Sequence, residues 1–513
     1  MKDYLEILDT YKEEMVETLR ELCRFPSVAE ATDPSAESPF GPAVQGALDY
    51  MLDKAARDGF AVKNVDNYGG HIDFPGKNAT AEDPGDIVAL VGHLDVVPVG
   101  DLSQWESDPF EMEIRDGKMY GRGTVDDKGP LLAAYFAVRA LKEAGFVPEK
   151  TIRIMLGCDE ETNWDGMTYY MEHEKVMPVS GFSPDAMFPV LYAEKGCLAF
   201  EVEGTFKESP SGGKADSASA HGLRLVSVKG GSVVNAVPDK AEAVIEGTPA
   251  ELSAVHLAAA TFKAVHPDFG DDAVTITELP AEEAAPAEDS AAAANTRKRL
   301  QLTFKGIPAH AAFPETGRSA VAMLCECFSG LPFASKDVNR AVRFFNDHIG
   351  YDYNGQRIGL AMADAPSGKL TFNAGLIEMD EAHVKWTIDV RHPVTTKAED
   401  VLAKLQAAVA EGAGASDYTV TLLRNELPLY KPADDPMITA LLESYKEFTG
   451  DTAAKPIAIG GATYARAVPN TVGFGPIMPD EPDMCHQANE FFSLDGYYTS
   501  AKIYAAAVKK LAE

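Results

Sequence analysis

A histidine and an aspartate two residues apart follow directly after a short apolar run in this chain. The run Asp86-Ile87-Val88-Ala89-Leu90-Val91 predicts a buried strand, and Gly92-His93-Leu94-Asp95-Val96-Val97-Pro98 comes after it. Ligand-binding side chains gather at the carboxyl ends of strands in open α/β folds. The chain is therefore expected to build a sheet whose edge carries His93 as a metal ligand, with the Asp95 carboxylate beside it.

Helix and strand patterns alternate through the first 197 residues. Apolar spacing predicts helices at 3–24, 40–58 and 129–145, and strands at 86–91 and 151–157. A strand, a helix and a strand in that order favour parallel pairing. The predicted fold class is α/β, with a mixed, mostly parallel sheet sandwiched by helices.

The middle of the chain, residues 198–427, reads as a separate α+β domain with a weak internal repeat. Strands are expected at 226–231 and 241–247 before a helix at 250–265, and the order recurs with strands at 370–377 and 384–390 before a helix at 397–412. Loops at 209–220 and 280–294 read as flexible surface insertions. Residues 428–513 return to helix and strand alternation. We predict one discontinuous domain of 1–197 and 428–513, with 198–427 inserted into it.

The composition excludes several classes of protein. The 513 residues include 46 Lys and Arg against 79 Asp and Glu, a formal net charge of −33, which argues against a nucleic-acid partner. No secretory signal pattern and no apolar run of about 18 residues is present, so no membrane span is expected. The six cysteines are scattered without disulfide or zinc-finger spacing. A cytoplasmic location is therefore predicted.

Four more acidic or histidine-bearing sites accompany His93. Asp126 stands where the chain enters the helix at 129, Asp159-Glu160-Glu161 ends the strand at 151–157, Asp185 follows a turn, and His486 precedes Glu490 near the C-terminus. Each alone also has a structural interpretation: a helix cap, a solvated acidic loop, a turn residue or a hydrogen-bonded histidine.

Taken together, these residues form a plausible ligand set. His93, Asp126, Glu161, Asp185 and His486 offer two imidazoles and three carboxylates, which suits zinc, manganese or cobalt. Five ligands exceed what one catalytic zinc needs. If one carboxylate bridges, they divide into two sites of three, and paired metals can activate a shared water.

The motifs resemble those of the co-catalytic di-zinc peptidase family that includes aminoacylases, glutamate carboxypeptidases and desuccinylases, and within it the PepV-type (Xaa-His) dipeptidases. The resemblance spans nearly the whole chain in family order. Its motifs are 92–98, 120–130 (Tyr-Gly-Arg-Gly-Thr-Val-Asp-Asp-Lys-Gly-Pro), 159–162, Asp185 with 194–196, 235–239, Ala309-His310 with Pro314 and Gly317, and 460–466.

The resemblance implies roles for the catalytic domain. His93, Asp126 and Asp185 would hold one metal, and Asp126, Glu161 and His486 the other, with Asp126 bridging. Asp95 would fix the ring of His93, and Glu160 would be the general base. It also implies a cis peptide after Asp126, which is costly for a residue other than proline.

The inserted domain resembles the lid of the family. There His310 would stabilise the developing oxyanion, Asn235 would assist at the substrate, and Arg391 would bind the substrate carboxylate. Gly461 and Thr463 would line the substrate pocket. Two departures are visible: Ala462 replaces an expected third glycine, and Ala488-Asn489 replaces the Pro-Asp pair often found after the last histidine, so the resemblance assigns Glu490 no role.

The resulting expectation is a cytoplasmic dipeptidase with two divalent metal ions, zinc first and manganese or cobalt as alternatives. Its partner would be a small peptide substrate, with no nucleic acid and no membrane, and the chain would be a monomer. An N-acyl amino acid deacylase of the same family and a non-catalytic peptide-binding homologue are the alternatives. Hydrolysis of a dipeptide compared with its N-acetylated form separates the dipeptidase from the deacylase.

Overall fold

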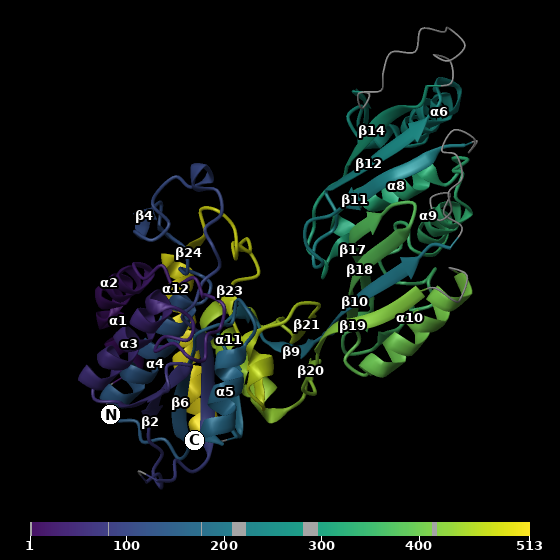
Figure 1. Ribbon diagram of the computed structural model, residues 1–513. Coiled ribbons are helices and arrows are strands. Elements are labelled where there is room, and N and C mark those ends of the chain that lie inside the picture. Colours follow the sequence, from purple (N-terminus) through teal and green to yellow (C-terminus); the bar gives the residue numbers. More distant parts are fainter. Residues whose placement is uncertain (1–2, 81, 176, 208–221, 281–295, 413–417) are drawn as a thin grey trace. The chain divides into compact units, whose positions relative to one another are not determined.

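Three parallel strands, β6 (Thr151–Gly157), β3 (Ile87–His93) and β7 (Ser180–Ser183), form the centre of the sheet that carries the candidate ligands. Figure 1 labels β6 of this sheet. The computed structural model describes residues 3–80, 82–175, 177–207, 222–280, 296–412 and 418–513. The expected loop at 209–220 lies outside the described residues, as does the loop at 280–294 apart from Pro280.

The described chain divides into two compact units. The first comprises Met1–Ala193, Leu429–Ala458 and Ala462–Glu513, and the second comprises Glu194–Pro428 and Ile459–Gly461. Their division of labour into a catalytic domain and a lid stays a prediction.

The sheet of the first unit is mixed. Its strand order is β1-β2-β6-β3-β7-β22, where β1 (Ala61–Val65), β2 (Gly69–Phe74) and β6 pair antiparallel, while β6, β3, β7 and β22 (Thr471–Gly473) pair parallel. This agrees with the predicted mixed, mostly parallel sheet. The edge hairpin of β1 and β2 was not expected from the sequence.

Both faces of this sheet are covered by apolar cores. Successive residues of a strand point to opposite sides, so one strand contributes to both cores. Val88 and Leu90 of β3 pack into the larger core, and Ile87, Ala89 and Val91 pack into a smaller one on the other face. The helices of the larger core are α1 (Tyr4–Thr10), α2 (Lys12–Cys23), α3 (Pro42–Arg57), α4 (Lys128–Glu143), α11 (Pro436–Thr449) and α12 (Leu494–Ala512). The smaller core contains residues of α5 (Asp165–Glu174) and the short helix η4 (Tyr464–Ala467).

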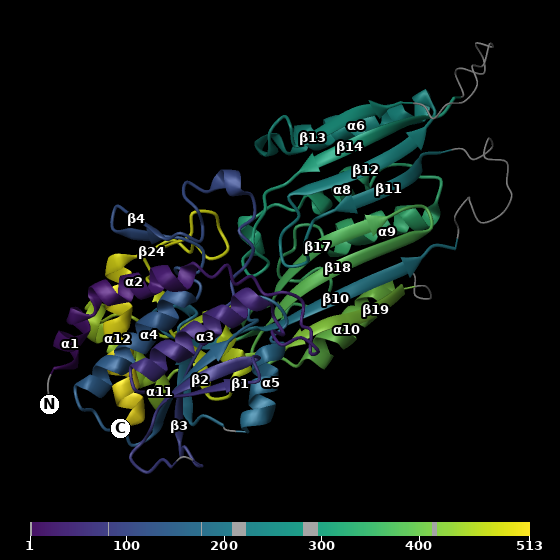
Figure 2. The ribbon, with the colours of Figure 1, turned by 60° about the vertical axis from the view of Figure 1, so that its left-hand side comes forward.

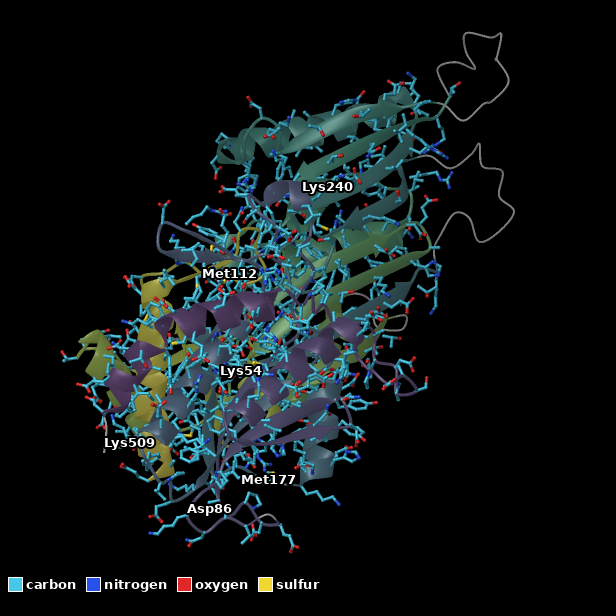
Figure 3. The ribbon with its side chains drawn as sticks, turned by 90° about the vertical axis from the view of Figure 1, so that its left-hand side faces the viewer. Lys54, Asp86, Met112, Met177, Lys240 and Lys509 are labelled. Carbon is cyan, nitrogen blue, oxygen red and sulfur yellow. The ribbon has the colours of Figure 1, made fainter. Side chains whose placement is uncertain are left out.

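Ion pairs tie the helices of the larger core together. Lys54 on α3, labelled in Figure 3, lies 2.8 Å from Glu14 of α2 and 3.6 Å from Asp58. The expected helix at 3–24 is interrupted at Tyr11, whose ring contacts Phe136 of α4. The helices expected at 40–58 and 129–145 are α3 and α4.

Short strands complete the first unit, and some of them lie where the residue ranges of the two units meet. They form a three-stranded sheet of β4 (Glu113–Arg115), β5 (Lys118–Tyr120) and β24 (Phe491–Ser493), a pair of β8 (Ala186–Met187) and β23 (Pro476–Ile477), and a sheet of β20 (Leu429–Tyr430), β9 (Leu191–Glu194) and β21 (Ile457–Ile459). The short helix η1 (Leu102–Gln104) precedes β4.

The second unit is built on an eight-stranded antiparallel sheet (Figure 2). Its order is β13-β14-β12-β11-β17-β18-β10-β19, with bounds β10 (Gly196–Thr205), β11 (Arg224–Gly230), β12 (Lys240–Gly247), β13 (Val274–Leu279), β14 (Lys298–Lys305), β17 (Thr371–Met379), β18 (His383–His392) and β19 (Tyr418–Glu426). Four helices pack into its core: α6 (Pro249–Val265), α8 (Ala320–Phe328), α9 (Lys336–His348) and α10 (Ala398–Gly412). The remaining elements in the described part of this unit are the pair β15 (Ala363–Asp364) and β16 (Gly368–Lys369) and the short helices η2 (Pro267–Phe269) and η3 (Pro314–Thr316).

The expected internal repeat is present in this sheet. The strands β11 and β12 precede α6, and β17 and β18 precede α10, which is the predicted order in both halves. The halves meet where β11 and β17 pair through Val228, Lys229 and Gly230. None of the helices in the described part of the chain combines the length and apolar character that a bilayer span requires.

Candidate metal centre

The candidate ligands come from the ends of neighbouring parallel strands. His93 is the last residue of β3, Glu160 and Glu161 follow β6, and Asp185 follows β7. Because β3 pairs parallel with both β6 and β7, these ends meet at one edge of the sheet. The arrangement is the one that the His-x-Asp motif predicted for this edge.

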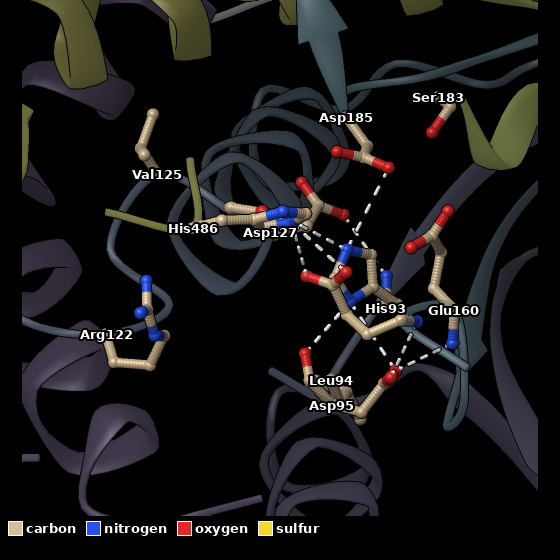
Figure 4. A network of polar contacts seen from close by, with 12 residues as sticks. His93, Leu94, Asp95, Arg122, Val125, Asp127, Glu160, Ser183, Asp185 and His486 are labelled. Carbon is tan, nitrogen blue, oxygen red and sulfur yellow. Dashed lines mark hydrogen bonds and ion pairs between the residues drawn. The ribbon is translucent and has the colours of Figure 1, made fainter. Parts of the chain in front are cut away.

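Asp126 lies between the two histidines. One of its carboxylate oxygens, Oδ1, is 3.2 Å from Nε2 of His93, and the other, Oδ2, is 3.1 Å from Nε2 of His486. Figure 4 labels the two histidines. The loop that presents it has a cis peptide bond between Asp126 and Asp127, as the family resemblance implied.

The remaining carboxylates each face one of the two histidines. His93 Nε2 is 3.8 Å from Asp185 Oδ2, and His486 Nε2 is 3.1 Å from both oxygens of Glu161. Two overlapping sets could each hold a cation: His93, Glu160 and Asp185, and His93, Asp126 and Glu161. The five expected ligands thus form one cluster within the first unit, with Glu160 next to it.

The chemistry of this cluster fits divalent cations. His93 is fully buried, and its Nε2 atom faces carboxylate oxygens of Asp126 at 3.2 Å and Asp185 at 3.8 Å. Burial raises the pKa of Glu161 to about 7, with a further contribution from the charge of Asp126, and burial raises the pKa of Asp185 to about 6. Crowded carboxylates of this kind repel unless a cation relieves them, and imidazole with carboxylate suits zinc, manganese or cobalt.

Asp95 holds the acidic loop in position. Its carboxylate is fully buried and accepts hydrogen bonds from the backbone amides of Glu160 at 3.1 Å and Glu161 at 3.0 Å. The Nδ1 atom of His93 lies 2.9 Å from the backbone carbonyl of Asp95 and 3.5 Å from its carboxylate. The ring of His93 therefore has its nearest partner in the main chain of Asp95.

Glu160 differs from its neighbour in its surroundings. Burial raises the pKa of Glu160 well above its usual value, and the charge of Asp185 adds to this. Its backbone carbonyl accepts a hydrogen bond from the Trp164 indole at 2.6 Å. A carboxyl group with a raised pKa beside a ligand cluster is a candidate for acid and base chemistry.

Two residues of this centre were not singled out from the sequence. Asp127 Oδ2 accepts a hydrogen bond from the backbone amide of His93 at 3.1 Å. The ring of Tyr464, which is fully buried, stands edge-on to His93 with centroids 6.1 Å apart. Asp127 could have been found from its adjacency to Asp126, and Tyr464 lies within the 460–466 motif, which assigned it no role.

The second unit brings Asn235 and His310 together. The backbone amide of Ala311 donates to Asn235 O at 2.9 Å, and Val237 N donates to Ala309 O at 2.8 Å. The Asn373 side chain donates to the carbonyls of Val234 and Ala236 on either side of Asn235. These two predicted substrate residues therefore sit on adjoining segments, and His310 is exposed.

Arg391 has a buried environment in the same unit. It is 4 % exposed, and its guanidinium donates to both carboxylate oxygens of Asp389, at 2.6 and 3.0 Å. Gly461 belongs to the second unit and Thr463 to the first, where Thr463 Oγ1 accepts from Ala465 N at the start of η4. The substrate roles of Arg391, Gly461 and Thr463 stay predictions.

Comparison with known proteins gives consistent relatives over the whole chain. The model of "Peptidase family M20/M25/M40" matches residues 89–510. The Bacillus subtilis protein YtjP is 33 % identical over 507 residues, covering 98 % of each chain. The Beta-Ala-Xaa dipeptidase of Lactobacillus delbrueckii subsp. lactis is 32 % identical over 511 residues, covering 99 % of this chain and 98 % of that protein.

Solved structures show the same fold. Human carnosine dipeptidase 1 aligns with a TM-score of 0.55 at 17 % identity, covering all of this chain and 98 % of that one. The coverage of the family model and of the relatives leads to one conclusion. The chain belongs to peptidase family M20/M25/M40 and is a peptide-bond hydrolase.

Proposed function

We propose that this protein is a metal-dependent dipeptidase whose catalytic centre is the cluster at the carboxyl ends of β3, β6 and β7. The observation that carries the proposal is a cluster of two imidazoles and three carboxylates, with Asp126 between the histidines and Glu160 beside the cluster. Membership of a peptidase family and the Beta-Ala-Xaa dipeptidase among the relatives support this substrate class.

The proposed ligands are His93, Asp126 and Asp185 for one ion, and Asp126, Glu161 and His486 for the other. We propose two divalent ions, with zinc as the first choice and manganese or cobalt as alternatives. Such ions, when bound, lower the pKa of a water molecule and polarise the carbonyl of the peptide bond.

The protein's own groups would handle the protons. Glu160 would take a proton from the attacking water as the C–O bond forms, and would then deliver it to the nitrogen of the leaving amine so that the C–N bond can break. Burial raises the pKa of Glu160, which makes its carboxyl a candidate for proton exchange. Asp95 would keep Glu160 and Glu161 in register through their backbone amides.

The second unit would supply substrate recognition. In this proposal His310 stabilises the developing oxyanion, Asn235 assists at the substrate, and Arg391 binds its C-terminal carboxylate. Gly461 and Thr463 would line the substrate pocket. Support for these roles comes from the sequence motifs. The segments of Asn235 and His310 adjoin, which supports a common role of the two residues at the substrate.

The proposal includes a cytoplasmic monomer that acts on small peptides without a nucleic-acid or membrane partner. The net charge of −33 supports the exclusion of nucleic acid. The six cysteines are free thiols, and five of them are buried, which is consistent with a reducing compartment.

A panel of substrates tests the proposed specificity. Protein stripped with a chelator and resupplied with zinc, manganese or cobalt is assayed on a dipeptide, its N-acetylated form and a matching tripeptide. The proposal predicts metal-restored cleavage of the free dipeptide above the other two. Preferred cleavage of the N-acetylated form would favour a deacylase instead, and tight binding without any product would favour a peptide-binding homologue.

A further inference from the structure

A buried ion pair outside the proposed ligand set connects the loops of the metal centre. Arg122 is 2 % exposed and Glu490 is fully buried, and Nη1 of Arg122 lies 2.6 Å from Oε2 of Glu490. Burying two charges carries a desolvation cost of several kcal/mol per ion that the pair alone often fails to offset. The pair therefore calls for a purpose beyond ordinary packing.

Glu490 holds the loop that presents Asp126. Its second oxygen, Oε1, accepts hydrogen bonds from the backbone amides of Val125 at 3.0 Å and Asp126 at 3.3 Å. Its backbone carbonyl accepts another from Gly121 N at 3.0 Å. Both ends of the segment 121–126 are thereby hydrogen-bonded to a single residue. The position of the Asp126 backbone, and so of its carboxylate, therefore depends on Glu490.

Arg122 reaches the two other loops that carry histidines. Its Nη1 lies 3.4 Å from the carbonyl of Gln487, the residue after His486, and its Nη2 lies 3.4 Å from the carbonyl of Pro98, on the segment that leaves His93. Figure 4 draws Arg122 and Val125 together with the ligand network. One guanidinium and one carboxylate thus contact the backbones of three ligand-bearing segments.

The contacts separate two interpretations of this pair. A pair that served stability alone could be replaced by apolar groups of similar size with little loss. A pair that positions ligands acts through directed hydrogen bonds to particular amides and carbonyls, as these do. Residues that orient metal ligands from outside the ligand set commonly affect metal affinity about 10–100-fold when they are changed.

We infer that Arg122 and Glu490 are positioning residues that hold Asp126 at the distance from His93 and His486 at which it can bridge two cations. This inference rests on the proposed ligand set. Neither residue belongs to the proposed ligand set or to the proposed substrate residues, so the effect is exerted through the backbone of the three loops.

Metal affinity of the full-length protein tests the inference directly. Zn²⁺ affinity is measured by chelator competition, and Co²⁺ binding by its visible absorption, for Glu490→Ala, Glu490→Gln and Arg122→Lys. We expect about 10–100-fold weaker Zn²⁺ binding for Glu490→Ala. Glu490→Gln keeps an acceptor for the amides but loses the charge, so a smaller loss and a shifted Co²⁺ spectrum are expected, as for Arg122→Lys.

A second ion pair in the same unit, with Arg153 buried and Asp73 partly buried, supplies the control. The Arg153 guanidinium donates two hydrogen bonds to the Asp73 carboxylate, at 2.7 and 2.8 Å. This pair lies outside the three ligand-bearing loops. Asp73→Asn should lower the thermal midpoint while leaving Zn²⁺ affinity and the Co²⁺ spectrum unchanged.

The outcomes distinguish this inference from the proposed function. Wild-type affinity and spectrum in Glu490→Gln and Arg122→Lys would overturn the positioning role, and these milder variants decide if Glu490→Ala does not fold. Asp126→Ala should weaken Zn²⁺ binding whatever Glu490 does. If Asp126→Ala binds Zn²⁺ as the wild type does, the proposed ligand set itself is wrong.

Discussion

At the scale of single residues, two neighbouring glutamates have different roles in the proposed centre. Glu161 faces His486 at 3.1 Å, whereas Glu160 groups with His93 and Asp185. Sequence alone could propose that one of the pair binds metal and the other acts as a base, because adjacent carboxylates repel unless a cation relieves them. Their assignment came from the family resemblance.

Glu160→Gln is expected to retain bound zinc and lose turnover. Removing a general base typically costs about 10²–10⁴-fold in rate, so kcat on a dipeptide should fall by that factor while metal content stays at the wild-type value. The matched variant Glu161→Gln should instead lose zinc affinity. A Glu160→Gln protein that keeps more than about a tenth of the wild-type kcat would contradict the assignment of the base.

A second residue-scale prediction concerns His71, away from the metal centre. His71 is 5 % exposed and its Nδ1 lies 2.8 Å from the Tyr170 hydroxyl. Burial lowers the pKa of His71 from 6.5 to about 4, and the charge of Arg153 acts in the same direction. Between these values the unfolded chain binds a proton that the folded chain does not.

The contribution of His71 to stability should therefore be complete above pH 6.5 and be lost as the pH falls toward 4. The full loss is about 3 kcal/mol, from about 1.36 kcal/mol per pKa unit. Denaturant unfolding of the first unit at pH 7 and pH 4.5 measures it, and His71→Gln should flatten the difference. The exposed His383→Gln is the control. An equal acid loss in His71→Gln and wild type would contradict this.

At the scale of elements, local sequence patterns account for most of the helices and strands. The predicted strand at 86–91 and helix at 129–145 correspond to β3 and α4, because apolar periodicity is strong where an element is buried. Gly92 shows a constraint that periodicity does not reveal. A Cβ there would lie 2.5 Å from Asp127 Oδ2 and 2.9 Å from Leu131, so the strand can carry His93 into the site only with glycine before it.

The start of α6 offers a test of stability in the second unit alone. Thr248 and Glu251 form a reciprocal capping box, with Thr248 N donating to Glu251 Oε2 at 2.8 Å and Glu251 N donating to Thr248 Oγ1 at 3.3 Å. Thr248→Ala should lower the free energy of unfolding by about 1 kcal/mol, measured by denaturant titration. Ser253→Ala, exposed on the same helix, should change it by less than about 0.5 kcal/mol. Equal effects of the two would contradict the capping role.

At the scale of the whole molecule, the discontinuous chain explains why parts of the centre escaped sequence analysis. Glu490 lies in the C-terminal segment and fixes a loop near residue 125, a contact that depends on the tertiary fold rather than on any local pattern. Tyr464 reaches His93 from η4 in the same way. Position after a predicted strand pointed to His93 and Glu161, whereas Asp185 and His486 joined the predicted ligand set through the combination of residues and the family resemblance.

Chelation is expected to act on the first unit and spare the second. A cation that binds only the folded state stabilises it by RT ln(1 + [L]/Kd), about 2.7 kcal/mol at one hundred times Kd. Hydrogen exchange after zinc removal should rise in segments 87–98, 121–131 and 484–490 of the first unit. The sheet of the second unit, including β12 and β18, serves as the internal reference. A uniform rise in both units, or none in the first, would contradict a centre built by the first unit.

The central claim is a centre of two cations around Asp126 that hydrolyses dipeptides. Its most direct test is a titration of metal-free protein with Zn²⁺, in which bound metal and dipeptide hydrolysis are measured in the same samples. The proposal predicts that hydrolysis is absent without metal and reaches its plateau at two equivalents of tightly bound Zn²⁺. A plateau at one equivalent would contradict the bridging role of Asp126, and hydrolysis by the metal-free protein would contradict the metal-dependent mechanism.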